Sequence, residues 1–232
     1  MALSDSRSTF PQAVSRAIRE AIGVLLPVDC VGCGETDASL CEDCSASVPD
    51  APAVRTLGNG FPVWAGSSYD GVVRRALLAL KNEQRTDVAP ALAPLLHAAF
   101  ERALADLPMR SGTIADLQLA TIPSSRSAYR RRGYRPVDRV VVKAGLKAQH
   151  PLALIRQPDD QIGLGLTARQ GNLVGSLRAR NWARGRTFLL VDDVVTTGAT
   201  LLEARRALAE GGAEVVGAVV IAATPRRIIA ST

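Results

Sequence analysis

The hydrophobic and polar positions of this chain follow two periods, and each period predicts one kind of element. Apolar residues at helical spacing predict amphipathic helices over residues 10–26, 71–81, 87–105 and 200–210. Short apolar runs that end at glycine, proline or polar residues predict buried strands over residues 61–69, 117–123, 187–191 and 214–224. The last third has the order strand, helix, strand with short connections, which indicates a right-handed parallel βαβ unit. We therefore predict an α/β fold, a parallel sheet flanked by helices.

The same pattern divides the chain into three parts. Residues 1–48 hold the N-terminal helix and all four cysteines, residues 49–60 contain Pro and Gly and are interpreted as a linker, and residues 61–232 form the main domain. Within the main domain, residues 156–172 are polar and lack a clear period. Long unpatterned loops in compact domains are often mobile lids.

Composition places the chain among ordinary globular proteins, with 47% hydrophobic and 22% charged residues in a total of 232. The apolar run at residues 215–223 is shorter than the about 20 residues that a membrane-spanning helix needs. The first ten residues include an acid and lack an apolar core, so they do not resemble a secretory signal. We expect a cytoplasmic protein without a membrane span.

The positive charge of the chain is concentrated in one segment. The net charge is +6, and residues 126–147 contain one acid, Asp138, and eight basic residues: Arg126, Arg130, Arg131, Arg132, Arg135, Arg139, Lys143 and Lys147. A basic segment permits contact with nucleic acid, but phosphorylated metabolites also select for basic pockets. Arg130 to Arg132 are therefore interpreted either as solvated surface residues or as a patch that contacts nucleic-acid phosphates. We expect this segment to begin as a loop and to become a helix near Pro136.

Two adjacent acids, Asp192 and Asp193, follow the apolar run 187–191 directly. Burying like charges together is unfavourable, so a role in packing does not explain them. Ligands of open α/β sheets bind at the carboxyl ends of the strands, and the helix that follows presents unpaired N–H groups to anions. The turn into this helix consists of Thr196, Thr197, Gly198, Ala199 and Thr200. A ribose 5-phosphate suits this pairing, with its hydroxyls on the acids and its phosphate on the turn; the alternatives are an acidic strand end with an ordinary helix cap and a receiver-type metal pocket.

The four cysteines form two C-x-x-C pairs, Cys30 with Cys33 and Cys41 with Cys44. Each pair can present two thiolates to one tetrahedral ion, so we predict a structural zinc site without a catalytic role. The alternatives are disulfides, which the expected location disfavours, or unrelated thiols.

The acids and the turn resemble the phosphoribosyl diphosphate (PRPP) signature of type I phosphoribosyltransferases. With the cysteine pairs in front of it, the chain resembles the ComF/GntX family of bacterial proteins linked to competence and DNA utilisation. Further similar stretches are "YDGVVRRALLALK" at 69–81, "IPSSRSAYRRRGY" at 122–134 and "QIGLGLTARQGN" at 161–172; Arg135-Pro136 depart from the family's usual Asn-Gln.

The resemblance implies a type I phosphoribosyltransferase fold that binds PRPP with Mg²⁺ and transfers phosphoribosyl to an unidentified nitrogen acceptor. It implies that Asp192 and Asp193 bind the ribose hydroxyls and that residues 196–200 bind the 5-phosphate. The candidate contacts of the diphosphate are Ser124, Ser125, Arg126, Lys81 and Arg169, of which Lys81 and Arg169 are equally well interpreted as surface residues. No catalytic residue is assigned. The alternative is a non-catalytic protein of the same fold that senses PRPP or contacts DNA or the uptake machinery.

Overall fold

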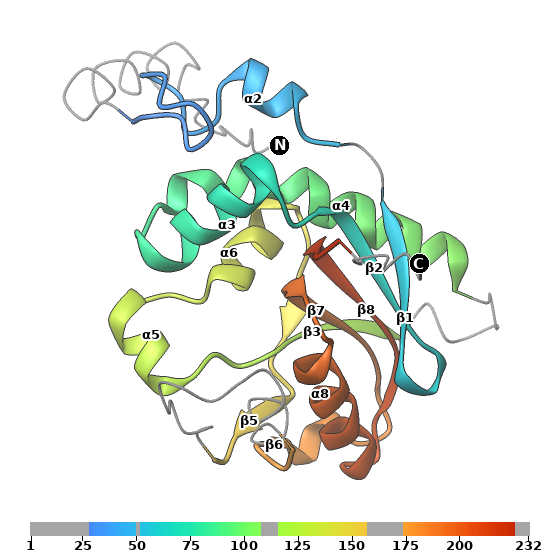
Figure 1. Cartoon of the computed structure of the whole chain (residues 1–232). Helices are drawn as coiled ribbons and strands as arrows, with labels where there is room; N and C mark the ends of the chain where they lie inside the picture. The colour runs from blue at the N-terminus through green and yellow to red at the C-terminus, as the bar shows by residue number, and fades with distance from the viewer. Residues whose placement is uncertain (1–27, 50–51, 108–115, 157–173, 226–232) are drawn as a thin grey trace, which may run out of the picture.

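The computed structural model describes residues 28–49, 52–107, 116–156 and 174–225, with the elements arranged as in Figure 1. In chain order these elements are α2 (Glu42–Ala46), β1 (Ala53–Leu57), η1 (Gly58–Gly60), β2 (Phe61–Ser68), α3 (Gly71–Asn82), η2 (Thr86–Val88), α4 (Ala89–Asp106), β3 (Leu117–Thr121), α5 (Arg126–Arg132), α6 (Pro136–Lys143), β4 (Ala148–Gln149), β5 (Leu152–Leu154), β6 (Leu177–Ala179), η3 (Asn181–Ala183), β7 (Thr187–Val195), α8 (Ala199–Glu210) and β8 (Glu214–Ala223). No helix within these described ranges is long and apolar enough to cross a membrane.

The main sheet has six strands in the order β1-β2-β8-β7-β3-β4. Strand β1 is antiparallel to β2, and the other neighbouring pairs are parallel. Strands β5 and β6 form a separate antiparallel pair. The α/β fold with a mostly parallel sheet is confirmed, and β7, α8 and β8 form the expected βαβ unit.

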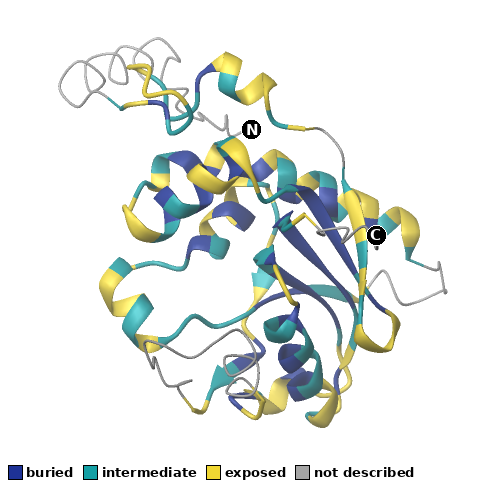
Figure 2. Cartoon of the chain, in the orientation of Figure 1, coloured by how far each residue is buried: buried dark blue, intermediate teal, exposed yellow. Residues whose placement is uncertain are grey.

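Helices cover both faces of the sheet, which explains why its central strands are apolar on both sides. On one face Leu189 and Val191 of β7 pack in the cluster that includes residues of α3, α4 and α6. On the other face Phe188 and Leu190 pack in the cluster that includes residues of α8. Figure 2 shows this buried centre in dark blue along the strands and the inner sides of the helices. Each fully buried side chain of this size contributes about 1.5–3 kcal/mol.

The connections after β3 and after β7 lead to opposite edges of the sheet, and the candidate site lies at this point. The chain leaves β3 towards α6 and β4 on one side, whereas it leaves β7 towards α8 and β8 on the other. Because α6 and α8 lie on opposite faces, this point is the topological switch, where open α/β sheets bind ligands outside the carboxyl ends of the strands. Asp192 and Asp193 lie at this end of β7.

The structure differs from the sequence expectations in several segments. The arginine-rich stretch begins as helix α5 rather than as a loop, because Ser125 caps its start and Gly133, with a φ of 75°, ends it. The expected linker at residues 49–60 contains the edge strand β1. The pattern predicted none of β1, β4, β5 and β6. The helix expected at residues 10–26 and residues 157–172 of the expected lid lie outside the described residues.

Candidate functional site

The two acids at the end of β7 have different surroundings. The Oδ2 atom of Asp193 lies 2.7 Å from Nζ of Lys81, at the C-terminal end of α3. The side chain of Lys81 is 28% exposed and that of Asp193 is 16% exposed, so the ion pair is partly shielded from water. Asp192 accepts a hydrogen bond at Oδ1 from the backbone N–H of Asp193 (2.9 Å). The structure therefore places the sequence-predicted Lys81 against one of the two predicted acids.

The protonation of Asp192 is sensitive to pH near neutrality. Burial and, second, the charge of Asp193 raise the pKa of Asp192 to about 7, although the N–H of Asp193 and the ammonium of Lys81 act in the opposite direction. Near pH 7, the Asp192 carboxyl can thus either accept a hydrogen bond from a sugar hydroxyl or, when protonated, donate one.

The turn between β7 and α8 has the geometry of an anion site. The backbone N–H groups of Thr196, Thr197 and Gly198 have no internal hydrogen-bond acceptor within the described ranges. The N–H of Ala199 donates to Oγ1 of Thr197 at 3.4 Å. This hydrogen bond is long and therefore weak, so an anion could replace the hydroxyl as the acceptor. Helix α8 begins at Ala199, so its positive dipole end faces the same space.

Gly198 is required in this turn for two reasons. Its φ is +81°, a conformation that L side chains rarely adopt, and a Cβ atom there would lie 2.3 Å from Cδ1 of Leu57. The edge strand β1 therefore packs directly against the turn. A second contact from β1 supports it, because Nη1 of Arg55 donates to the carbonyl oxygen of Thr196 (2.9 Å). The sequence reasoning missed this role of Arg55, since β1 itself was not predicted.

A cavity of about 440 Å³ lies on the β8 side of the turn, next to β1 and the ends of β2 and β8. Arg55, Ser67 and Thr224 are among the residues that line it. The Ser67 hydroxyl is buried and has no hydrogen-bond partner in the described part of the chain. No motif of the sequence predicted this cavity.

The loop after β3 lies beside the acids because β3 and β7 are paired, with Thr121 opposite Val191. Ser125 accepts the N–H of Ala128 at 3.2 Å, which makes it the N-cap of α5. Arg126 is exposed and makes no contact with either acid among the described residues. Ser124, Ser125 and Arg126 stay predicted diphosphate contacts, and Arg169 lies outside the described residues.

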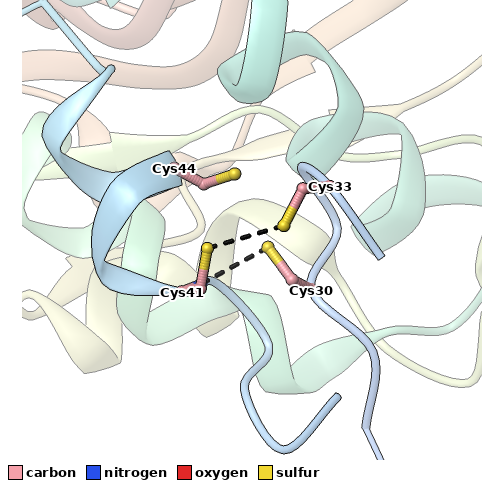
Figure 3. A group of neighbouring side chains, drawn as sticks. All are labelled: Cys30, Cys33, Cys41 and Cys44. Atoms are coloured by element: carbon pink, nitrogen blue, oxygen red, sulfur yellow. Dashed lines mark hydrogen bonds between the residues drawn. The ribbon is translucent and has the colours of Figure 1, made fainter. Parts of the chain in front are cut away.

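The four cysteine sulfurs point toward a common centre, as Figure 3 shows, and all lie within 4.8 Å of one another. The Sγ atoms of Cys33 and Cys41 are 3.6 Å apart. Four sulfurs bound tetrahedrally to zinc at about 2.3 Å are separated by about 3.8 Å, so the cluster has the dimensions that this ion needs. A Cβ atom on Gly32 would lie 2.4 Å from Sγ of Cys44, so a glycine is needed for the knuckle to close.

The thiols of the cluster cannot all ionise without a cation. Burial raises the pKa of Cys30, but the backbone N–H groups of Cys41, Cys33 and Gly32 outweigh it and lower this pKa to about 6. The backbone N–H of Cys44 lowers the pKa of Cys41, but burial and the neighbouring thiols of Cys33 and Cys30 raise it to about 12. A divalent ion would stabilise all four thiolates together.

Residues 129–231 match the family described as "Phosphoribosyl transferase domain", a range that includes both acids, the turn and α8. This part of the chain is a phosphoribosyltransferase domain. Its relatives include two proteins named DNA utilization protein YhgH. That of Escherichia coli O157:H7 is 28% identical over 203 residues, covering 81% of this chain and 85% of that protein. That of Salmonella typhi is 27% identical over 191 residues, covering 77% and 81%.

A third relative is similar to a smaller part of the chain. The orotate phosphoribosyltransferase of Methanopyrus kandleri is 44% identical over 80 residues, which is 34% of this chain and 36% of that protein. The ComF-type resemblance, a cysteine cluster in front of a phosphoribosyltransferase domain, is thus confirmed by relatives that match most of the chain.

Proposed function

We propose that this protein binds PRPP at the carboxyl end of β7 and transfers its phosphoribosyl group to a nitrogen acceptor. The observation that carries this proposal is the acid pair in the last part of β7, two residues before a turn whose N–H groups have no acceptor among the described residues, both inside the matched domain. Asp192 and Asp193 would accept hydrogen bonds from the ribose hydroxyls. Residues 196–200 would hold the 5-phosphate with backbone N–H groups and threonine hydroxyls.

The chemistry needs positioning and fixed charge rather than a protein nucleophile. The bond between ribose C1 and the diphosphate oxygen breaks first, which leaves an oxocarbenium-like centre, and the acceptor nitrogen then bonds to C1 and releases its proton to water. Lys81, Arg126 and the N–H groups beside Ser124 would stabilise the leaving diphosphate. Mg²⁺, when bound with PRPP, would neutralise diphosphate oxygens. The acceptor is unassigned, because the relative named for orotate matches only 34% of this chain.

Calorimetry with Mg²⁺ and PRPP tests the proposal. The wild type should bind PRPP, and Asp192→Asn/Asp193→Asn should weaken binding by about 100-fold, the loss of two charged hydrogen-bond acceptors. Asp116→Asn is the matched control, since Asp116 is exposed and lies before β3. Diphosphate release should then be assayed across nucleobases and amines. Equal affinity of the wild type and the double variant would refute the placement of the site.

We further propose that the cysteine cluster holds one structural zinc ion. Four sulfur ligands leave no open position, so the ion would stabilise the module without taking part in the transfer.

The second candidate function is contact with DNA, in line with the name of the relatives. Arg126, Arg130 and Arg131 of α5 are exposed, and the ring of Tyr129 is 48% exposed beside them. Arginines with an exposed aromatic ring suit single-stranded nucleic acid, where bases stack and phosphates pair with cations. Salt-dependent binding of single-stranded DNA should weaken in Arg130→Ala/Arg131→Ala. It should stay unchanged in Arg74→Ala/Arg75→Ala, which removes the same charge from the exposed side of α3.

A further inference from the structure

The last turn of α3 is held by residues that lie far from it in the sequence. The final carbonyl groups of a helix have no partner inside the helix. The carbonyl of Ala79 accepts backbone N–H groups of Glu83 and Arg85. The next two are satisfied from the segment after β3: the hydroxyl of Tyr134 donates to the carbonyl of Leu80, and Nε of Arg132 donates to the carbonyl of Lys81.

Lys81 is therefore fixed through both its backbone and its side chain. Its backbone carbonyl accepts a hydrogen bond from the Arg132 guanidinium, and its ammonium lies 2.7 Å from the carboxylate of Asp193. Arg132 differs in this from its neighbours Arg130 and Arg131, which are exposed, whereas Arg132 is half-buried against α3. A cation at the C-terminal end of a helix is also favoured by the helix dipole.

The same segment connects Arg132 to the loop after β3, which holds the predicted diphosphate contacts. Helix α5 begins at Arg126, directly after the loop of Ser124 and Ser125, and ends at Arg132. The helix has seven residues, which is about two turns. The contact of Arg132 with α3 therefore links the position of Lys81 to that of the loop after β3. Ordering a lysine side chain costs about 2 kcal/mol of rotamer entropy. If the end of α3 frayed, the backbone of Lys81 would also move, and its ammonium would not stay against Asp193.

We propose that Arg132 and Tyr134 are positioning residues for PRPP binding: they fix the end of α3 so that the ammonium of Lys81 stays against Asp193. This inference rests on the proposed function and assigns Arg132 to the PRPP site rather than to a DNA-binding surface. Arg132 does not touch the acids and acts through Lys81.

A double-mutant cycle tests the inference by calorimetry with Mg²⁺ and PRPP. Arg132→Met should lower the affinity by about 5- to 30-fold, the range for loss of a charged hydrogen bond. Lys81→Met should lower it at least as much, and Arg132→Met should have no further effect in the Lys81→Met background. Arg131→Met, which removes the same charge from an exposed position, should bind within twofold of the wild type.

The pH profile separates this role from a general loss of structure. The charge of Lys81 acts against the rise in the pKa of Asp192. The apparent pKa of PRPP binding should therefore move upward in Arg132→Met and in Lys81→Met, and not further in the double variant. Tyr134→Phe keeps the ring and removes only the hydroxyl, so it should give a smaller effect in the same direction if Arg132→Met folds poorly.

A measurement without PRPP tests the positioning of Lys81 independently of the proposed function. Acetylation of Lys81 in the free protein, followed by mass spectrometry, should be slow in the wild type and in Arg131→Met, and faster in Arg132→Met. If labelling follows this order but PRPP does not bind, the proposed function is wrong and the positioning of Lys81 stands. Unchanged labelling in Arg132→Met, or additive losses of affinity in the double variant, would overturn the inference.

Discussion

Asp192 and Asp193 are neighbours in sequence, but only Asp193 has a cationic partner among the described residues. Asp192 is left with burial and with the charge of Asp193, both of which raise its pKa. An acid in this position destabilises the folded protein while it improves the site for a sugar hydroxyl. At Asp192, the folded protein is therefore less stable than it would be with a neutral side chain, and the site binds a sugar hydroxyl better.

Asp192→Asn should stabilise the ligand-free protein above pH 7. The pKa of this carboxyl is 3.8 ordinarily and about 7 in the folded state. Between these values the folded state binds more protons than the unfolded state, so stability falls as the pH rises through this window, and the full penalty is present above about pH 7. We expect a gain of about 1–3 kcal/mol at pH 8 and almost none at pH 4, measured by urea unfolding. Asp116→Asn should show no such difference, and a gain that is equal at both pH values would contradict the account.

Local spacing predicted the acids and the turn, because all of them lie within nine residues at a strand end. It could not predict that Lys81 pairs with Asp193 or that Arg132 caps α3. These contacts join residues from distant parts of the chain, and only the fold brings α3 against α5 on one side and against Asp193 of β7 on the other. The sequence identified Lys81 as a candidate diphosphate contact and Arg132 only as part of the basic segment, and it left open what each one contacts.

Among the elements, the turn between β7 and α8 depends on its neighbour β1. The side chain of Leu57 occupies the space where a Cβ atom of residue 198 would lie. The strands and helices with long, regular patterns were predicted, namely β2, α3, α4, β3, β7, α8 and β8. Strands β4, β5 and β6 have only two or three residues, too few for an alternating pattern to be visible.

Gly198→Ala should destabilise the protein and weaken PRPP binding together. The substitution adds backbone strain at a φ of +81° and a clash with Leu57, so we expect a loss of about 2–4 kcal/mol in urea unfolding. Gly60→Ala is the matched control, since its φ is +72° but a Cβ atom there would meet nothing within 4 Å. It should cost only about 1 kcal/mol. Leu57→Ala should recover part of the loss in the Gly198→Ala background, and equal losses for the two glycines would show that Leu57 does not press on the turn.

At the scale of the whole molecule, the cysteine module contacts the segment between α3 and α4 and the core around these helices. Nη2 of Arg85 donates to the carbonyl oxygen of Asp29, beside Cys30, and pairs with Asp87 on its other side. Val31 and Val48 pack against the cluster that includes α3 and α4. The sequence predicted the cysteine cluster from its spacing, but it interpreted residues 49–60 as a linker and gave no sign of this contact.

Loss of the metal should therefore destabilise more than the module itself. Cys33→Ser/Cys41→Ser should reduce the zinc content from one ion per chain to nearly none by elemental analysis, and the main melting transition should fall by about 5 °C or more. Arg85→Ala should keep the zinc and lower the same transition by a smaller amount, because only the contact between Arg85 and Asp29 is lost. Ser45→Ala, in the exposed part of α2, should change neither quantity. Stoichiometric zinc in the double cysteine variant would refute the metal site, whereas an unchanged melting transition after zinc loss would show that the module and the domain unfold independently.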